Sequence, residues 1–103
     1  MLLAGHIKPW RDCAPGERLD TRNGLAACPA HDVAFDVGLL TVRDTLEIVL
    51  TQRLARFVKD DELTRRYYGR PPMSGVLLFP EGAHRPLPKY LDWHRRHVFA
   101  DRP

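Results

Sequence analysis

The sequence predicts a small α+β domain in which two short antiparallel hairpins are interleaved with helices. The chain has 103 residues, enough for one domain with one modest core. Its 44% hydrophobic and 28% charged residues are ordinary for a globular protein. Short apolar segments separated by turn residues indicate strands, and prolines open the segments that have helical spacing. We therefore expect residues 1–103 to form a single domain.

The first hairpin is predicted from two apolar segments on either side of a charged loop. Residues 1–7 form a short apolar run that fits a strand ending at or beside His6. Residues 9–23 have the composition of a loop, and their charges of both signs could pin it by ion pairs. The turn dipeptide Asn23-Gly24 then leads into residues 25–28, which we expect to return as the second strand.

A short helix is expected next, because Pro29 suits the first helical position and Gly38 suits the residue after the end. Apolar side chains between them recur at the spacing of one helix face. The predicted apolar stripe consists of Ala30, Val33, Ala34 and Val37.

The second half of the chain repeats this alternation. Residues 39–42 and 46–50 are rich in β-branched side chains and predict a second hairpin. Residues 52–68 have a broken helical pattern, and Pro88 opens a last helix that runs to about Phe99. The segment between them, residues 70–86, is expected to be irregular apart from an extended stretch over 76–79.

Two acidic residues on the first helix could bind a metal ion. Asp32 and Asp36 are four residues apart and project from the same face, where like charges repel and a nearby cation is needed. On spacing alone we favour a surface pair, with Asp36 bound to Arg18 or Arg43. Carboxylates suit Mg²⁺ or Mn²⁺, and His31 as a third ligand would admit Zn²⁺ or Ni²⁺.

Histidine and asparagine side chains beside this helix have alternative interpretations. His6 follows the first strand and could take a proton from water near neutral pH, although a lone histidine is more often structural. Asn23 by itself is a common turn former. We expect His94 to pack or hydrogen bond in the core, and Trp10 and Trp93 to be core anchors.

Taken together, the segments AGHIKPW, RLDTRNGLAAC and HDVAFDVGLLTV, with the closing YLDWHRRHVF, resemble the HNH endonucleases. The resemblance is to a bacterial branch close to restriction endonucleases. It implies a ββα-metal (His-Me finger) motif with an added hairpin and C-terminal helices. It also implies divalent-metal-dependent hydrolysis of phosphodiester bonds in DNA.

The resemblance assigns roles by position. His6 corresponds to the general base that activates water, and Asn23 to the asparagine that ties the loop so that this histidine points at the phosphate. Asp32 and Asp36 occupy metal-ligand positions on the helix, and His31 is the other candidate for the family's last histidine.

Two further expectations concern the strand and the loop. Gly5 stands where many HNH enzymes carry Asp or His, so the strand contributes no side-chain ligand. Cations of the loop could contact phosphates, with solvated or ion-paired side chains as the alternative. These cations are Lys8, Arg11, Arg18 and Arg22.

Composition and charge indicate the partner and the compartment. A net charge of +3 and a pI near 9.2 are compatible with DNA as partner. No apolar run reaches membrane-spanning length, and the two cysteines, Cys13 and Cys28, suit reduced thiols in a cytoplasm. Relatives usually have more chain before the first strand, so we expect a missing N-terminal recognition segment, or a homodimer. The alternative functions are a non-catalytic HNH remnant that binds nucleic acid or a partner, and a purely structural fragment.

Overall fold

The predicted α+β class is confirmed by a computed structural model, which describes residues 3–70, 73–79 and 82–101. The described residues form two antiparallel two-stranded sheets. The first pairs β1 (Leu3–His6) with β2 (Gly24–Ala27), and the second pairs β3 (Leu40–Val42) with β4 (Ile48–Leu50). The helices are α1 (Pro15–Arg18), α2 (Pro29–Asp36), α3 (Gln52–Asp60), α4 (Glu62–Tyr68) and α5 (Pro88–His97).

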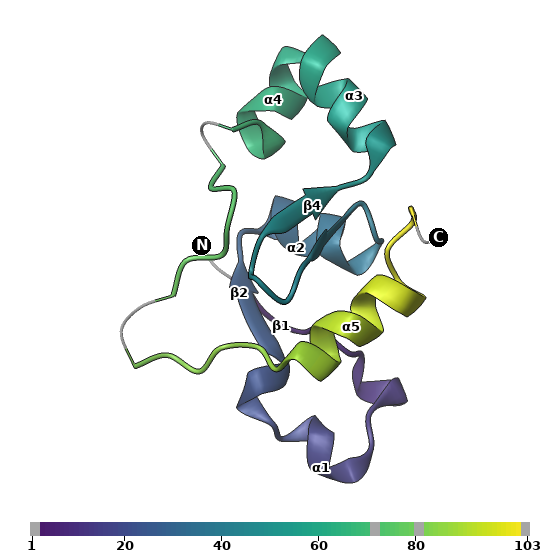
Figure 1. Cartoon of the computed structure of the whole chain (residues 1–103), viewed down its shortest axis with the longest axis vertical. Helices are drawn as coiled ribbons and strands as arrows, with labels where there is room; N and C mark the ends of the chain where they lie inside the picture. The colour runs from purple at the N-terminus through teal and green to yellow at the C-terminus, as the bar shows by residue number, and fades with distance from the viewer. Residues whose placement is uncertain (1–2, 71–72, 80–81, 102–103) are drawn as a thin grey trace.

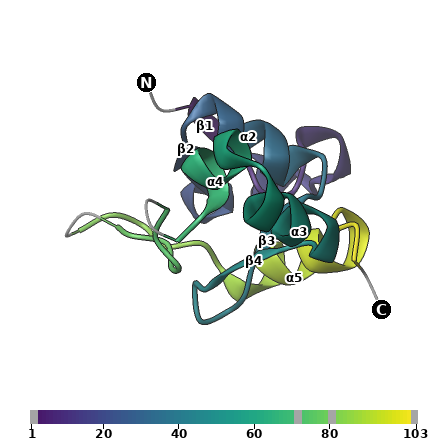
Figure 2. The ribbon, with the colours of Figure 1, turned by 90° about the horizontal axis from the view of Figure 1, so that it is seen from above.

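The molecule is elongated, with extents of 43 × 33 × 23 Å. Figure 1 shows α3 and α4 at one end of the long axis and the β1–β2 connection with α1 at the other. The hairpins, α2 and α5 lie between these ends. Seen from above, residues 73–79 and 82–86 reach out to one side of the helices (Figure 2). No helix in the described ranges is long and apolar enough to span a membrane.

The first hairpin has the predicted strands but a different connection. Gly5 pairs with Leu25 and His6 with Gly24, while Met1 and Leu2 of the predicted strand lie outside the described residues. The connection is compact rather than irregular, because it contains α1 and two 3-10 turns, at Trp10–Asp12 and Thr21–Asn23. Asn23 ends the second of these turns and β2 begins at Gly24, so the two residues do not form a tight two-residue hairpin turn. The side chain of Asn23 is fully buried.

Helix α2 begins at Pro29 as predicted and is followed by Gly38, whose φ of 81° suits a residue without a Cβ. The predicted apolar stripe is wrong for its two valines, although Ala34 is buried and Ala30 is partly buried. Val33 and Val37 are 58% and 59% exposed, whereas Ala34 and Phe35 are buried. The ring of Phe35 buries more apolar area than a valine and stacks on His94 with 3.6 Å between the ring centroids. Helix α2 is therefore oriented with the Phe35 face, and not the valine face, toward the core.

The predicted break in the next helical segment is confirmed. Thr51 caps α3 by accepting a hydrogen bond from the Leu54 amide, and Asp61 caps α4 by accepting one from the Thr64 amide. The predicted extended stretch over 76–79 is reduced to an isolated bridge between Glu47 and Val76. Residues 71–72 and 80–81 of the predicted irregular segment lie outside the described ranges.

The core lies between α2, the second hairpin and α5. Its buried apolar members are Ile7, Ala34, Phe35, Leu40, Val42, Ile48, Tyr90 and Leu91. His94 is buried among them as predicted, whereas Trp10 is 51% exposed and is not a core anchor. Trp93 is partly buried on α5.

Both ring nitrogens of His94 are hydrogen bonded. Nε2 lies 2.7 Å from the carbonyl oxygen of Phe35, which can only accept, so Nε2 carries the proton. Nδ1 then accepts from the Thr41 hydroxyl at 2.7 Å. This neutral ring joins α5 to α2 and to β3, and burial lowers the pKa of His94 from 6.5 to about 4.

We expect stability to fall as the pH drops from 6.5 toward 4, because only the unfolded chain then takes up the His94 proton. The loss should be about 3 kcal/mol at the lower pH. Urea unfolding of the wild type and of His94→Gln, which does not titrate, measures it. The advantage of the wild type should shrink over this pH range, and parallel curves for the two proteins would contradict the assignment.

Candidate functional site

His6 is exposed at the end of β1, where the chain enters the β1–β2 connection. Its ring stands edge-on to Trp10 with 5.9 Å between the ring centroids. Nε2 lies 3.5 Å from the carbonyl oxygen of Arg18, at the outer limit for a hydrogen bond. The ring therefore faces solvent and is not turned into the core.

Asn23 is buried beneath this strand end and holds the backbone that follows His6. Its Oδ1 accepts from the Lys8 amide at 2.9 Å, and its Nδ2 donates to the Lys8 carbonyl oxygen at 3.1 Å. The Ile7 amide donates to the carbonyl oxygen of Asn23 at 3.0 Å. Nδ2 also lies 3.4 Å from the sulfur of Cys13. Asn23 can thus position His6 but does not reach the surface.

Asp32 lies directly against β1 at Gly5. A Cβ on Gly5 would stand 2.9 Å from Oδ1 of Asp32, closer than real Cβ contacts. Any side chain at position 5 would therefore push the carboxylate away. Gly5 not only supplies no side-chain ligand, as the sequence indicates, but also makes room for the carboxylate of Asp32.

Asp36 lies near Asp32 on the same face of α2, as the spacing predicts. Burial, and second the charge of Asp32, raise the pKa of Asp36 above its usual 3.8. The alternative pairing with Arg18 or Arg43 is not found among the described residues. Arg18 lies over the Trp10 ring, and Arg43 pairs with Glu47 at 3.4 Å.

His31 makes its contacts with α4 and not with the two acids. Its Nε2 lies 2.6 Å from the carbonyl oxygen of Tyr67, and its ring is tilted against Tyr68 at 5.3 Å. The side chain thus joins α2 to α4. Over the described ranges, no three His, Cys, Asp or Glu side chains gather closely enough to hold a metal ion.

Most cations of the predicted phosphate-contact set have partners in the loop itself. Lys8 pairs with Glu17 at 2.9 Å and Arg22 with Asp20 at 3.0 Å. Arg18 donates to the carbonyl oxygen of Trp10 at 3.2 Å. Arg11 is the most exposed of the four, 3.6 Å from Asp12 with 85% of its side chain exposed.

Glu17 was not singled out from the sequence, yet it links the loop to α5. It accepts from the Ala14 amide at 3.0 Å and binds Lys8 and Lys89 at 2.9 and 3.1 Å. The Ala14 and Lys8 hydrogen bonds are the largest causes that lower the pKa of Glu17 to about 2. Lys89 is 72 residues away, so no local pattern indicates this contact.

The donor chemistry fits a hard divalent cation. Asp32 and Asp36 have no cationic side chain as partner among the described residues, and the charge of Asp32 disfavours ionisation of Asp36. Mg²⁺ or Mn²⁺ is commonly held by one or two carboxylates with water completing the shell. The two acids could hold such an ion without His31, and the chemistry gives no reason to expect Zn²⁺.

Comparison with known proteins agrees with the resemblance seen in the sequence. Residues 1–43 match a family model described as HNH endonuclease, which confirms the resemblance over this segment. A search of curated proteins gave no significant match. The fold is similar to a solved structure named "Modification dependent TagI restriction endonuclease", with a TM-score of 0.64 and 20% identity. The alignment covers 99% of this chain and 29% of that one, so this chain spans under a third of its length.

Replacing Asn23 by alanine should lower the free energy of unfolding by about 1–3 kcal/mol, because the buried amide and carbonyl of Lys8 lose their partner. Urea unfolding measures the change. Thr21→Ala, in the same turn, is the matched control: it removes only an exposed hydrogen bond to His84 and should have a smaller effect. Equal unfolding midpoints for Asn23→Ala and the wild type would contradict the positioning role.

Replacing Asp36 by asparagine should stabilise the metal-free protein at pH 7. The raised pKa means that ionised Asp36 is disfavoured in the folded state, and this penalty exists only above its unfolded value of 3.8. The gain, measured by urea unfolding in EDTA, should shrink as the pH falls through the raised pKa of Asp36 and be gone below about 3.8. Asp60→Asn, at an exposed position on α3, should give no comparable gain.

Proposed function

We propose that this chain is a divalent-metal-dependent endonuclease that hydrolyses phosphodiester bonds in DNA, with His6 as the general base. The HNH endonuclease match over residues 1–43 is its premise. One observation carries the proposal: Asp32 lies against Gly5, the residue next to exposed His6. Consecutive Cα atoms are about 3.8 Å apart, so base and acid share one end of β1.

The order of the elements supports a ββα-metal motif. β1 and β2 form the hairpin and α2 follows β2 directly, with the Asp32 carboxylate close to β1. We assign Asp32 and Asp36 as the residues that would hold the metal. Adjacent strand residues point to opposite faces, so His6 leaves β1 on the side away from Asp32. Because His6 is the last residue of β1, its ring would have to reach a phosphate held by the two acids around the end of the strand, not across one face of it.

The chain's own residues would act as follows. His6 takes a proton from water through its exposed ring, and Asn23 keeps the backbone after His6 from shifting. When bound, the metal would supply a Lewis acid that stabilises negative charge on the phosphate. Arg11 is the loop cation best placed for a phosphate contact, because Lys8 and Arg22 are held by Glu17 and Asp20.

We further propose that residues 1–103 act as the nuclease domain of a DNA restriction or processing system in the cytoplasm. Restriction as the setting is supported by the similar solved structure, which is named a restriction endonuclease. The much greater length of that enzyme supports a separate recognition segment, and a homodimer is the alternative source of target recognition.

His6→Ala should reduce plasmid cleavage in Mg²⁺ or Mn²⁺ by about 10²–10⁴-fold with little change in DNA affinity, because a general base acts in the chemical step. Gel electrophoresis measures cleavage, and fluorescence anisotropy in EDTA measures binding. His97→Ala removes a histidine on α5, away from β1, and should cut at the wild-type rate. DNA binding without cleavage by the wild type would instead support a non-catalytic HNH remnant.

A further inference from the structure

Three cationic side chains stand apart from all others in the described residues. Arg53, Arg56 and Lys59 are exposed and have no ion pair, side-chain hydrogen bond or aromatic partner there. Every other described lysine or arginine has at least one such partner, whether a carboxylate, a backbone carbonyl or an aromatic ring. The three unpartnered cations all belong to α3.

Their spacing gathers them on one side of the helix. Residues three apart on a helix are neighbours, and Arg53, Arg56 and Lys59 are separated by three each. At about 1.5 Å per residue they extend over about 9 Å of helix. Successive phosphates of one DNA strand advance about 3.4 Å along the duplex axis, so the row can meet more than one phosphate.

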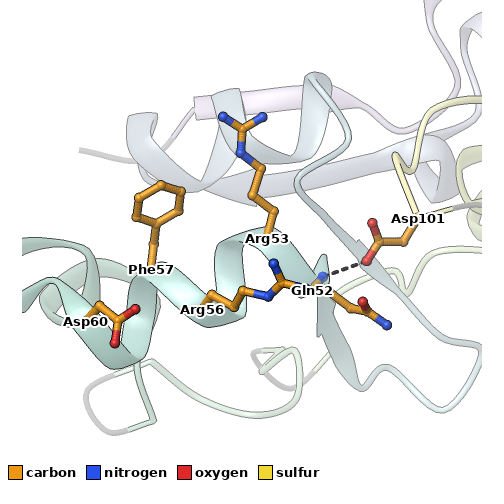
Figure 3. Close-up of a pocket in the computed structure, with 6 residues that line it drawn as sticks. All are labelled: Gln52, Arg53, Arg56, Phe57, Asp60 and Asp101. Atoms are coloured by element: carbon orange, nitrogen blue, oxygen red, sulfur yellow. Dashed lines mark hydrogen bonds between the residues drawn. The ribbon is translucent and has the colours of Figure 1, made fainter.

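The surface beside these cations contains an aromatic ring. Phe57 is 50% exposed, and Figure 3 shows it projecting to the same side of α3 as Arg53. Gln52, Arg53, Arg56, Phe57, Asp60 and Asp101 line a shallow depression here. Asp101 accepts a hydrogen bond from the Gln52 amide at 2.6 Å, and no ion pair joins Asp101 or Asp60 to Arg53 or Arg56 in the described residues. The ring therefore lies at one edge of the cationic row, where it could contact the sugars of a backbone whose phosphates the cations bind.

Helix α3 starts close to the C-terminal end of α2, the helix that carries Asp36. The Thr51 amide donates to the carbonyl oxygen of Leu39, three residues after the end of α2, at 2.9 Å. The Ala100 amide donates to the Gly38 carbonyl oxygen at 2.9 Å, and Asp101 caps α3.

We propose that Arg53, Arg56 and Lys59 form a second contact surface for the phosphate backbone of duplex DNA, separate from the loop of residues 8–22. The inference rests on the proposed nuclease function for its choice of partner. It adds a binding surface outside the segment that matches the family model, which ends at residue 43.

The test is binding of a fluorescent DNA duplex in EDTA, followed by anisotropy from low to high salt. Arg53→Gln/Arg56→Gln should weaken binding at low salt and reduce the slope of log K against log salt by about two, one per lost phosphate contact. The matched control, Arg43→Gln/Arg66→Gln, removes the same charge from two exposed arginines that pair with Glu47 and Glu62. It should bind nearly as the wild type does.

Two outcomes overturn the proposal: unchanged binding by the Arg53/Arg56 variant, or an equal loss in the control. Circular dichroism and thermal melting confirm that both variants are folded, and Lys59→Gln provides an independent single variant. Because the assay needs no cleavage, failure of the nuclease proposal remains distinguishable. A wild type that binds through α3 but never cuts refutes only the activity, whereas one that cuts while the α3 variant binds normally refutes only this surface.

Discussion

The connection between β1 and β2 is closed by the side-chain amide of Asn23, and the position of His6 depends on that closure. The amide occupies both backbone groups of Lys8, and the Ile7 amide is bound by the carbonyl of Asn23 itself. A loop of this length would otherwise move through many conformations and carry His6 with it. Glu17 and Asp20 add contacts to Lys89 and Tyr90 of α5, so the loop is fixed to the rest of the domain.

Helix α2 presents its acids in a way that disfavours their charge. Its ends are held by Tyr68, whose hydroxyl donates to the Ala30 carbonyl at 2.9 Å, and by the stacking of Phe35 on His94. These contacts keep Asp32 against Gly5 and Asp36 beside it, although the Asp32 charge opposes that of Asp36, which lies in the last helical turn. Unrelieved charge of this kind is typical of sites that bind a cation.

The lysines and arginines fall into two groups: those paired with acids of the protein and those without such a partner. In the loop, Lys8 and Arg22 are paired with nearby acids, and on α5 Arg95 and Arg96 are paired with Asp44 and Asp92. Such exposed pairs contribute little stability individually, but they leave little charge for a polyanion. The cations of α3 have no such partners among the described residues, so the count of charges alone does not show which surface has positive charge available for a polyanion.

By itself the sequence determined the types and order of the main elements and the segment that resembles the HNH endonucleases. Pro29, Gly38 and Pro88 act locally through their own backbone geometry, so their positions mark helix ends whatever the rest of the chain does. Only the tertiary structure decided which face of α2 is buried, that Asn23 lies inside, that His31 binds Tyr67 and which cations of the described residues lack partners. Those outcomes depend on partners far along the chain, such as His94 for Phe35 and Tyr67 for His31, which no local pattern specifies.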